Sequence, residues 1–403
     1  MDQVVFSSLK IGSLTIPHRI IRSATHEGMA DEEGAPTDQL TRIYIKLAQG
    51  EVGAIITGYA GIQPNGRSPF LGMLMIDRDE LIPAYRRLVD TVHRHQTALI
   101  LQIAHCGRQT RSKITGLRTV APSALKDKIY SEDRPIALSE QDIEQIIDNF
   151  VKAIGRAKEA GFDGVQLHAA HGYLLAQFLS PYTNRRKDQW GGSLSRRFRI
   201  IKEIYKRSRR QYGDYPVLIK INAYDNRPKG MRIQEALGIA GLLEQVGCCG
   251  IEVSCGFYED GFFTARCPHV PIDAILAYHF IYKKFPPFFA FMLKGIADTV
   301  IPHAKPVYNY NVSFARRIKE IVRIPVIVVG GIRNLEDIHT ILQEDSADAV
   351  SLCRPLIIDP GLVQKMKTGK QTQSSCIDCC YCLLGMEQQP LRCYYGRIPM
   401  GRN

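Results

Sequence analysis

The sequence contains no apolar run long enough to cross a membrane. A membrane-spanning helix needs about 18 or more consecutive apolar residues, and none of the 403 residues lies in such a run. The segment from Met1 to Lys10 carries Asp2 before any basic residue and has no apolar core of the kind found in signal peptides. We therefore expect a protein without a membrane span that is located in the cytoplasm.

The sequence also lacks the common nucleotide-binding and nucleic-acid-binding motifs. Neither G-x-G-x-x-G nor G-x-x-x-x-G-K-[ST] occurs, which argues against a Rossmann dinucleotide domain and a P-loop. The formal net charge is +12, and eleven of the 52 Lys and Arg residues fall between Arg185 and Arg210. A basic segment can attract phosphate-bearing molecules, but a solvated helix face is the simpler interpretation. No zinc finger or RNA-recognition signature accompanies it, so we expect no nucleic-acid partner.

Short runs of apolar and β-branched residues recur along the chain, with segments long enough for helices between them. Each run is nearly continuous in apolar character, as strands buried on both faces should be. They lie at Ile20–Ser23, Ala54–Thr57, Leu99–Ile103, Gly164–Leu167, Val217–Ile221, Ile251–Ser254, Val326–Val329 and Ala349–Leu352. Eight such repeats predict one (β/α)8 TIM barrel over residues 1–370, followed by a Cys-rich tail at residues 371–403.

Two local patterns refine this prediction. Ser139 and Asp142 resemble a capping box at the start of an amphipathic helix over residues 140–160, which Gly161 would end. Before the first strand, the segments Val4–Ser7 and Ser13–Ile16 flank Gly12, which suggests a small hairpin that closes the barrel bottom.

The connection after the sixth strand is unusually long and aromatic. Eleven of the 34 aromatic residues lie within Phe257–Phe291. Long loops at the C-terminal face of a barrel often carry function. This insertion is either a lid over an apolar substrate, a patch that touches a membrane, or a helical excursion packed on the barrel.

Polar groups gather after the fourth strand, where the chain reads His168-Ala-Ala-His171-Gly-Tyr173. We expect the two imidazoles on one side of a helical turn. They could bind a metal or donate hydrogen bonds to one oxygen atom, but no neighbouring carboxylate supplies a third ligand. Tyr173 offers a phenol that stays protonated at neutral pH, which suits a general acid. The position at the end of a barrel strand favours a catalytic role for all three.

Loops after the seventh and eighth strands carry features of a phosphate site. Gly330 and Gly331 would let the backbone approach an anion, and Arg354, which follows Cys353, could bind it in a bidentate manner. Barrel enzymes frequently bind phosphate with these two loops. A phosphate-bearing cofactor is therefore expected to bind the barrel itself.

The run GFDGVQLHAAHGYLLAQFLSPYTNRRKDQWGGSLSRR at residues 161–197 resembles the signature of the old yellow enzyme family, the FMN-dependent ene-reductases. The resemblance extends over nearly the whole chain. It includes the segments Arg22-Ser-Ala-Thr25, Thr57-Gly-Tyr-Ala60, Gln102-Ile-Ala-His105 and Pro325-Val-Ile-Val-Val-Gly-Gly-Ile332. The most similar branch is the bacterial one that contains single-domain NADH:flavin oxidoreductases and enoate reductases.

This resemblance implies FMN as cofactor and NAD(P)H as transient co-substrate. NAD(P)H would reduce FMN and leave, and an activated alkene would then accept a hydride and a proton in the same site. His168 and His171 would bind the substrate oxygen, and Tyr173 would deliver the proton. The cofactor contacts implied by position are Ser23, Ala24, Thr25, Ala60, Gln102, Lys220, Gly330, Gly331, Cys353 and Arg354.

The chain departs from the family at two of these positions. Many relatives have Arg where this chain has Lys220, and Gly where it has Cys353. Lysine keeps the positive charge that favours the anionic reduced flavin. Cys353 puts a side chain near the phosphate.

Five of the eleven cysteines lie between Cys376 and Cys393. Without a secretion signal, reduced thiols are the default. The spacing of Cys376, Cys379, Cys382 and Cys393 suits an iron–sulfur cluster or a structural zinc ion. The enoate-reductase branch has a four-iron cluster at a similar place, with a wider third gap. A packed cluster of reduced cysteines is the alternative.

The sequence thus predicts an NAD(P)H-dependent FMN ene-reductase with a small-molecule activated alkene as substrate. The alternative is an iron–sulfur enoate or enoyl-thioester reductase fed by an electron-transfer protein. Two other classes stay open, an FMN barrel enzyme acting on amines or a thioester and a non-catalytic electron-transfer subunit. We also expect a homo-oligomer.

Overall fold

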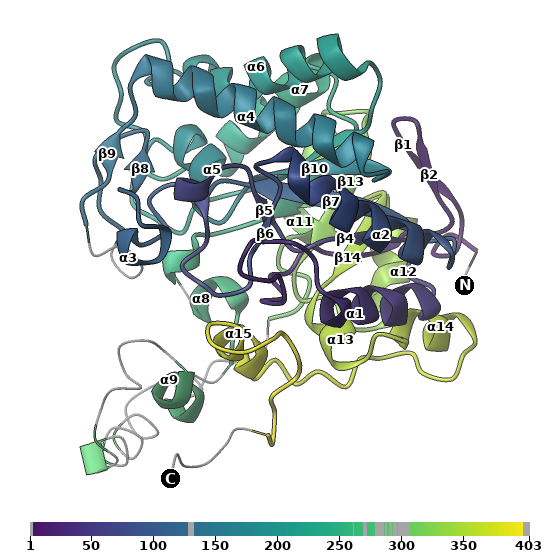
Figure 1. The fold of residues 1–403 in the computed structure, drawn as a ribbon. Coiled ribbons are helices and arrows are strands. Elements are labelled where there is room, and N and C mark those ends of the chain that lie inside the picture. Colours follow the sequence, from purple (N-terminus) through teal and green to yellow (C-terminus); the bar gives the residue numbers. More distant parts are fainter. Residues whose placement is uncertain are drawn as a thin grey trace.

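Eight parallel strands close into a barrel in the computed structural model (Figure 1). The model describes residues 3–127, 133–260, 262–268, 272–278, 286, 288–289, 292, 296 and 307–397. The barrel strands are β3 (Ile20–Arg22), β4 (Ala54–Ile56), β7 (Ala98–Ala104), β10 (Gly164–Ala169), β11 (Val217–Asn222), β12 (Ile251–Ser254), β13 (Val326–Val329) and β14 (Ala349–Leu352). Pairing of β10 with β7 completes the ring. The predicted TIM barrel is confirmed. Each predicted strand begins and ends within two residues of the corresponding observed strand.

Helices cover the outside of the barrel, one or more after each strand. The longer ones are α1 (Asp38–Gln49), α2 (Ile82–His93), α4 (Glu140–Glu159), α6 (Leu194–Tyr212), α7 (Ile233–Gln245), α11 (Val312–Lys319) and α12 (Leu335–Gln343). Shorter ones are α3 (Ser112–Thr115), α5 (Leu174–Leu179), α8 (Phe262–Ala265), α9 (Ile272–Tyr278), α13 (Arg354–Ile358), α14 (Leu362–Lys367) and α15 (Tyr381–Gly385). None of the helices in the described ranges is long and apolar enough to cross a membrane.

Helix α4 forms as its sequence predicts. The Ser139 side chain accepts a hydrogen bond from the backbone N–H of Asp142, and the Asp142 side chain accepts one from the backbone N–H of Ser139. This capping box satisfies N–H groups that have no partner within the helix. The apolar residues at helical spacing, among them Ile143, Ile147 and Ile154, are buried against the barrel.

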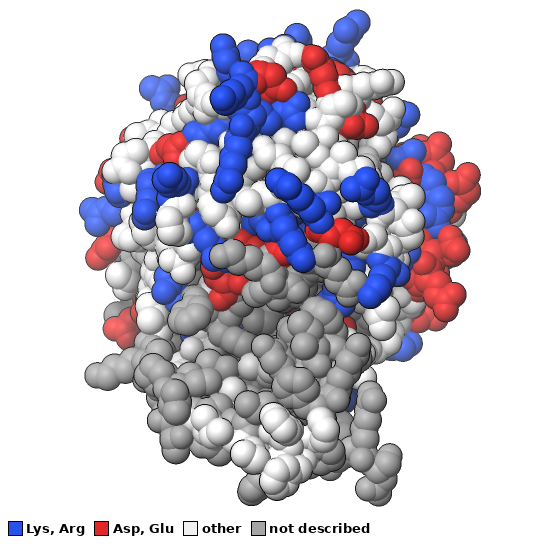
Figure 2. Space-filling model, turned by 90° about the vertical axis from the view of Figure 1, so that its left-hand side faces the viewer, with Lys and Arg blue, Asp and Glu red and all other residues white. Residues whose placement is uncertain are grey.

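The basic segment lies mostly on a solvated surface, as the simpler interpretation predicts. Helix α6 buries Phe198, Ile201 and Tyr205, while Lys202 and Lys206 on its other face are exposed. Lys and Arg side chains, with some acidic ones among them, spread over the upper part of the molecule, where Figure 1 places α4, α6 and α7 (Figure 2). The helix is therefore amphipathic, and its charge faces water.

A hairpin does close the barrel bottom, but its first strand is not where we expected it. Strand β1 (Leu9–Ile11) pairs with β2 (Leu14–Ile16), whereas residues 4–7 form turns. The alternation of Leu9 and Ile11 explains the shift, because both pack with Ile16 on the apolar residues that fill the lower barrel. Short strands also occur at β5 (Ala60–Gly61), β6 (Leu74–Met75), β8 (Val120–Ala121) and β9 (Ile136–Ala137).

The C-terminal segment returns to the end of the barrel that carries the loops after the strands. Backbone hydrogen bonds join Ser374 to Arg333 and Leu391 to Glu27. Helix α15 contacts α9 from the insertion after β12 (Figure 1). Several parts of the aromatic insertion, among them residues 261, 269–271, 279–285, 287 and 290–291 of Phe257–Phe291, lie outside the described residues.

Candidate active site

A cavity opens where the C-terminal ends of the barrel strands meet the loops that follow them. Twelve of the thirteen predicted catalytic and cofactor residues line it: Ser23, Ala24, Thr25, Gln102, His168, His171, Tyr173, Lys220, Gly330, Gly331, Cys353 and Arg354. Ala60 does not line the cavity. It is fully buried in β5, between β6 and β7, and its contact with the cofactor stays a prediction.

The two histidines and the tyrosine converge, although not through a helical turn. His168 lies in β10, and the next turn places both His171 (φ 58°) and Gly172 (φ 82°) in the left-handed region. A Cβ at Gly172 would lie 2.3 Å from Phe257, so only glycine fits there. This tight turn, rather than the expected helical spacing, puts the His168 ring centroid 5.2 Å from that of His171 and 4.6 Å from that of Tyr173.

Hydrogen bonds and burial set the protonation of these imidazoles. The backbone N–H of Ala170 donates to Nδ1 of His168, at 3.4 Å, which leaves the proton of the neutral ring on Nε2. Nε2 of His171 lies 2.7 Å from the Ser254 hydroxyl. Burial, aided by the positive charge of Lys220, lowers the pKa of His171 to about 3 and that of His168 well below its ordinary value. Both rings are therefore neutral hydrogen-bonding groups at physiological pH.

Buried neutral histidines also predict how the fold responds to acid. Burial lowers the pKa of His26 to about 4 and that of His105 to about 3, as for His171. Unfolded histidines titrate near about 6.5, so below that pH the unfolded chain binds more protons and stability falls. We expect a loss of about 1.4 kcal/mol per pH unit for each such histidine. Thermal unfolding between about pH 7 and pH 5, above the carboxylate range, measures it; a melting temperature that rises on acidification would contradict it.

Tyr173 belongs to a chain of hydroxyl groups. Its Oη donates to Oη of Tyr59 at 3.3 Å, and Oη of Tyr59 lies 3.1 Å from Oγ of Ser68. Burial raises the pKa of Tyr59. Tyr59 therefore keeps its proton at neutral pH, and the chain connects Tyr173 to this proton-bearing group.

The lower wall of the cavity holds a buried ion pair. Lys220 is 2 % exposed, and its Nζ lies 3.2 Å from Oε2 of Glu252 and donates to Oγ of Ser23 at 3.0 Å. Burial alone would raise the pKa of Glu252, but the Lys220 ammonium and hydrogen bonds from Ser351, Ser23 and Gln166 outweigh it and lower this pKa. Glu252 is therefore a carboxylate.

An acidic residue from the C-terminal segment contacts the predicted phosphate loops. Gly330 and Gly331 have φ values of 135° and 74°, and a Cβ on either would lie within 3 Å of the neighbouring segment. Asp378, from the C-terminal segment, forms ion pairs with both Arg333 and Arg354, the latter at 2.9 Å. The Cys353 sulfur lies 3.1 Å from the Thr25 hydroxyl. The C-terminal segment thus contacts the arginines directly.

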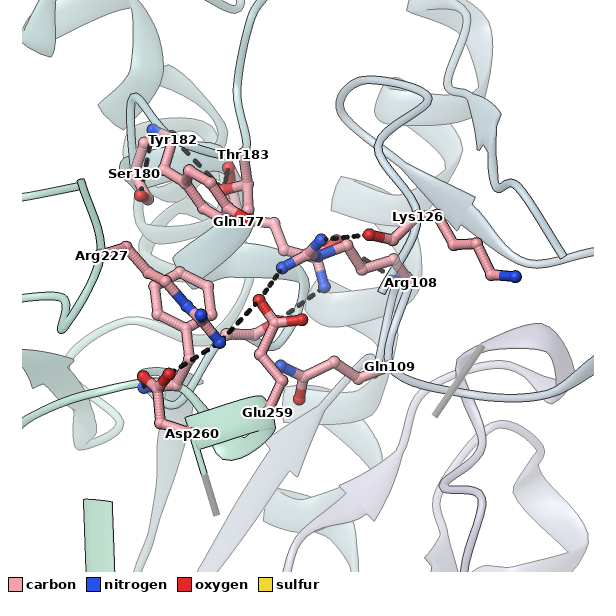
Figure 3. Close-up of polar contacts among 12 residues, drawn as sticks. Arg108, Gln109, Lys126, Gln177, Ser180, Tyr182, Thr183, Arg227, Glu259 and Asp260 are labelled. Atoms are coloured by element: carbon pink, nitrogen blue, oxygen red, sulfur yellow. Dashed lines mark hydrogen bonds and ion pairs between the residues drawn. The ribbon is translucent and has the colours of Figure 1, made fainter. Parts of the chain in front are cut away.

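A buried ion network holds the start of the insertion against the barrel loops (Figure 3). Nη2 of Arg108, after β7, lies 2.8 Å from Oε1 of Glu259, and Nη2 of Arg227, after β11, lies 3.2 Å from the same oxygen. Arg227 also binds Asp260 at 2.7 Å. The adjacent backbone N–H of Tyr258 donates to the carbonyl of His171 at 2.9 Å. The network therefore fixes the loop that abuts the His171 turn.

The predicted metal site lies at the C-terminal cysteines. Among the described residues, no three His, Cys, Asp or Glu side chains group as metal ligands. Burial raises the pKa of the Cys379 thiol, and the nearby Cys376 and Cys393 thiols raise it further. A metal held by Cys376, Cys379, Cys382 and Cys393 stays a prediction.

Cys380 forms a disulfide with Cys267, 113 residues earlier, which corrects the expectation of reduced thiols throughout. The cysteine spacing gave no hint of this pair, because Cys267 lies in the insertion after β12. The other nine cysteines are free.

The barrel and the cavity with its neutral imidazoles, phenol and buried ammonium define a TIM-barrel oxidoreductase site of the flavin-dependent class. A model of the NADH:flavin oxidoreductase / NADH oxidase family matches residues 4–253 and 293–373. The chain belongs to this family, the old yellow enzyme family of FMN-dependent NAD(P)H oxidoreductases.

Individual relatives agree with this assignment. The chain is 35 % identical to an NADH oxidase of Thermoanaerobacter brockii over 393 residues, which cover 96 % of this chain and 54 % of that protein. It is 31 % identical to an NADPH dehydrogenase of Listeria monocytogenes serotype 4b over 359 residues, covering 88 % and 92 %. The fold matches a 2-naphthoyl-CoA reductase complex with a TM-score of 0.81 at 23 % identity, covering 98 % of this chain and 57 % of that one. The chain thus spans about half the length of the T. brockii protein.

The cavity fits FMN, the cofactor of this family. Ser23, Gln102 and Lys220 supply polar groups on one wall, and the glycine loop with Arg354 lies on another. The positive φ of Gly330 and Gly331 lets the backbone itself face a bound group, as phosphate binding requires. FMN would accept hydride from NAD(P)H and pass it on.

Sequence reasoning missed several residues of this site. It named Lys220 but not its partner Glu252, although opposite charges on adjacent, otherwise apolar strands could have revealed the pair. Tyr59 lies within a segment that carried the family resemblance, but nothing in the sequence links it to Tyr173. Asp378 lies between Cys376 and Cys379, which were interpreted as metal ligands, and its own role was not considered.

Proposed function

We propose that the protein is an ene-reductase, which uses FMN and NAD(P)H to reduce the C=C bond of an activated alkene such as an α,β-unsaturated carbonyl compound. The observation that supports this best is the convergence of two neutral imidazoles and a phenol on the cavity that FMN fits. NAD(P)H supplies a hydride and solvent a proton, and the alkene becomes the saturated compound.

The histidines would bind and polarise the substrate. Nε2–H of His168 donates to the carbonyl oxygen, and His171 lies beside it on the same wall. Negative charge grows on this oxygen as hydride reaches the β-carbon, so donors already in place stabilise the transition state. A neutral imidazole donates a hydrogen bond and keeps its proton, so it does not have to be deprotonated and reprotonated in each turnover.

Tyr173 would then give its phenol proton to the α-carbon. The hydroxyl chain through Tyr59 to Ser68 orients the phenol and offers a neighbouring proton donor. General acids of this kind contribute about 10²–10⁴-fold to rate.

Tyr173→Phe is the test. We expect reduction of 2-cyclohexenone to slow by about 10²-fold or more, while reduction of bound FMN by NADH changes little, because no proton from Tyr173 is needed there. Anaerobic stopped-flow absorbance measures the two half-reactions separately. Tyr59→Phe, which keeps the Tyr173 phenol, is the control and should have a smaller effect. Equal losses in both half-reactions would refute the role of Tyr173.

An iron–sulfur enoate or enoyl-thioester reductase fed by an electron-transfer protein is the second candidate. The spacing of Cys376, Cys379, Cys382 and Cys393 in the sequence supports it. An iron assay of the anaerobically purified protein separates the ene-reductase from the iron–sulfur reductase. Iron in a stoichiometric amount would favour the iron–sulfur reductase. Association into a homo-oligomer remains part of the proposal.

A further inference from the structure

The centre of the polar network under the cavity is Glu252, which itself does not line the cavity. Its side chain is fully buried in β12. Oε1 accepts hydrogen bonds from Oγ of Ser23 at 2.7 Å and Oγ of Ser351 at 2.6 Å. Oε2 accepts one from Nε2 of Gln166 at 2.7 Å and lies 3.2 Å from Nζ of Lys220. The carboxylate thus joins four different strands or strand ends of the barrel.

Glu252 fixes the orientation of a cavity-lining amide through Gln166. A carboxylate only accepts hydrogen bonds, so Gln166 must turn its NH₂ group toward Glu252. Oε1 of Gln166 then accepts from Nε2 of Gln102 at 2.7 Å. Gln102 is thereby left with its carbonyl oxygen and one N–H available on the cavity side. Reversing either amide would place two donors or two acceptors against each other.

Glu252 also fixes the charge on the cavity wall. Lys220 donates to Oγ of Ser23, and Ser23 in turn donates to Glu252, so the ammonium is held from two directions. The carboxylate offsets much of the Lys220 charge because both groups are buried, where interactions between charges are strong. A single side chain outside the cavity therefore controls both the position and the effective charge of the ammonium.

We propose that Glu252 is a positioning residue of the flavin site, which holds the Lys220 ammonium and the Gln102 amide in place and sets the reduction potential of bound FMN. This inference depends on FMN binding and deepens the proposed function, but it does not require that the substrate is an alkene.

The test is the midpoint potential of the FMN holoenzyme carrying Glu252→Gln. Glutamine keeps the size of the side chain but removes its charge, so Lys220 is no longer offset and the more negatively charged reduced cofactor is favoured. We expect the midpoint potential to become more positive by about 30 mV. For a two-electron couple this shift corresponds to a change of about tenfold in binding, in favour of reduced over oxidised FMN. Spectroelectrochemical titration reads this without any turnover.

Two further variants keep the proposal testable if the glutamine variant does not fold. Glu252→Asp retains the negative charge, but the shorter side chain places the carboxylate farther from Lys220. It should shift the potential in the same direction by a smaller amount. Glu33→Gln is the control, because it removes a carboxylate charge from an exposed ion pair with Arg78 away from the cavity, and should leave the potential close to that of the wild type. A wild-type potential in every Glu252 variant that binds FMN would overturn the proposal. Wild-type protein that NADH reduces but that reduces no alkene would instead refute the proposed function alone.

Discussion

A variant carrying both His168→Ala and His171→Ala is expected to reduce 2-cyclohexenone about 10³-fold more slowly than the wild-type protein. The two imidazoles lie on one wall with ring centroids 5.2 Å apart, and the tautomer of His168 directs an N–H away from the backbone. Without them the charge on the substrate oxygen loses the two imidazole donors that the proposed function assigns to it. Stopped-flow absorbance of reduced holoenzyme mixed with the alkene measures this step.

His93→Ala provides the matched control for this variant. His93 is partly exposed and paired with Asp163 at 2.8 Å on the outside of the barrel. Its removal should leave alkene reduction within about twofold of wild type, because neither His93 nor Asp163 lines the cavity. A double variant that retains wild-type rates would show that the substrate oxygen is bound elsewhere.

The Glu259→Gln variant is expected to destabilise the protein by about 3–5 kcal/mol, the usual effect of breaking a buried ion pair. Glu259 and Arg108 are both 0 % exposed, and the substitution removes the carboxylate charge between Arg108 and Arg227 (Figure 3). The guanidinium of Arg108 would then stay buried with its charge uncompensated. Chemical denaturation followed by circular dichroism measures the free energy of unfolding.

Glu33→Gln is the matched surface control. Glu33 pairs with Arg78 at 2.6 Å, but its side chain is 79 % exposed. Exposed pairs contribute at most about 1 kcal/mol, so this variant should be nearly as stable as the wild type. If Glu259→Gln were equally mild, the network would not be what holds the start of the insertion.

The sequence carried enough information for the barrel because its signals are local. Each strand is a short apolar run, and the capping box of α4 is made by residues three positions apart. His168, Gly172 and Tyr173 also follow one another closely, so their meeting depends on a single turn. The hairpin at the bottom was placed too early because Val4–Ser7 is apolar enough to resemble a strand, and the alternating inward contacts of Leu9 and Ile11 decided the observed position.

The remaining features depend on barrel closure. Glu252 meets Ser23 and Ser351 only because β14 returns to β3, more than 300 residues after it in the chain. Asp378 reaches Arg333 and Arg354, and Cys380 reaches Cys267, because the C-terminal segment folds back over the strand ends. The sequence by itself determined the fold and the family resemblance, and it predicted the catalytic residues that the proposed function uses. Only the tertiary structure decided which buried groups pair, because hydrogen bonds and ion pairs require contact between atoms that the chain order keeps far apart.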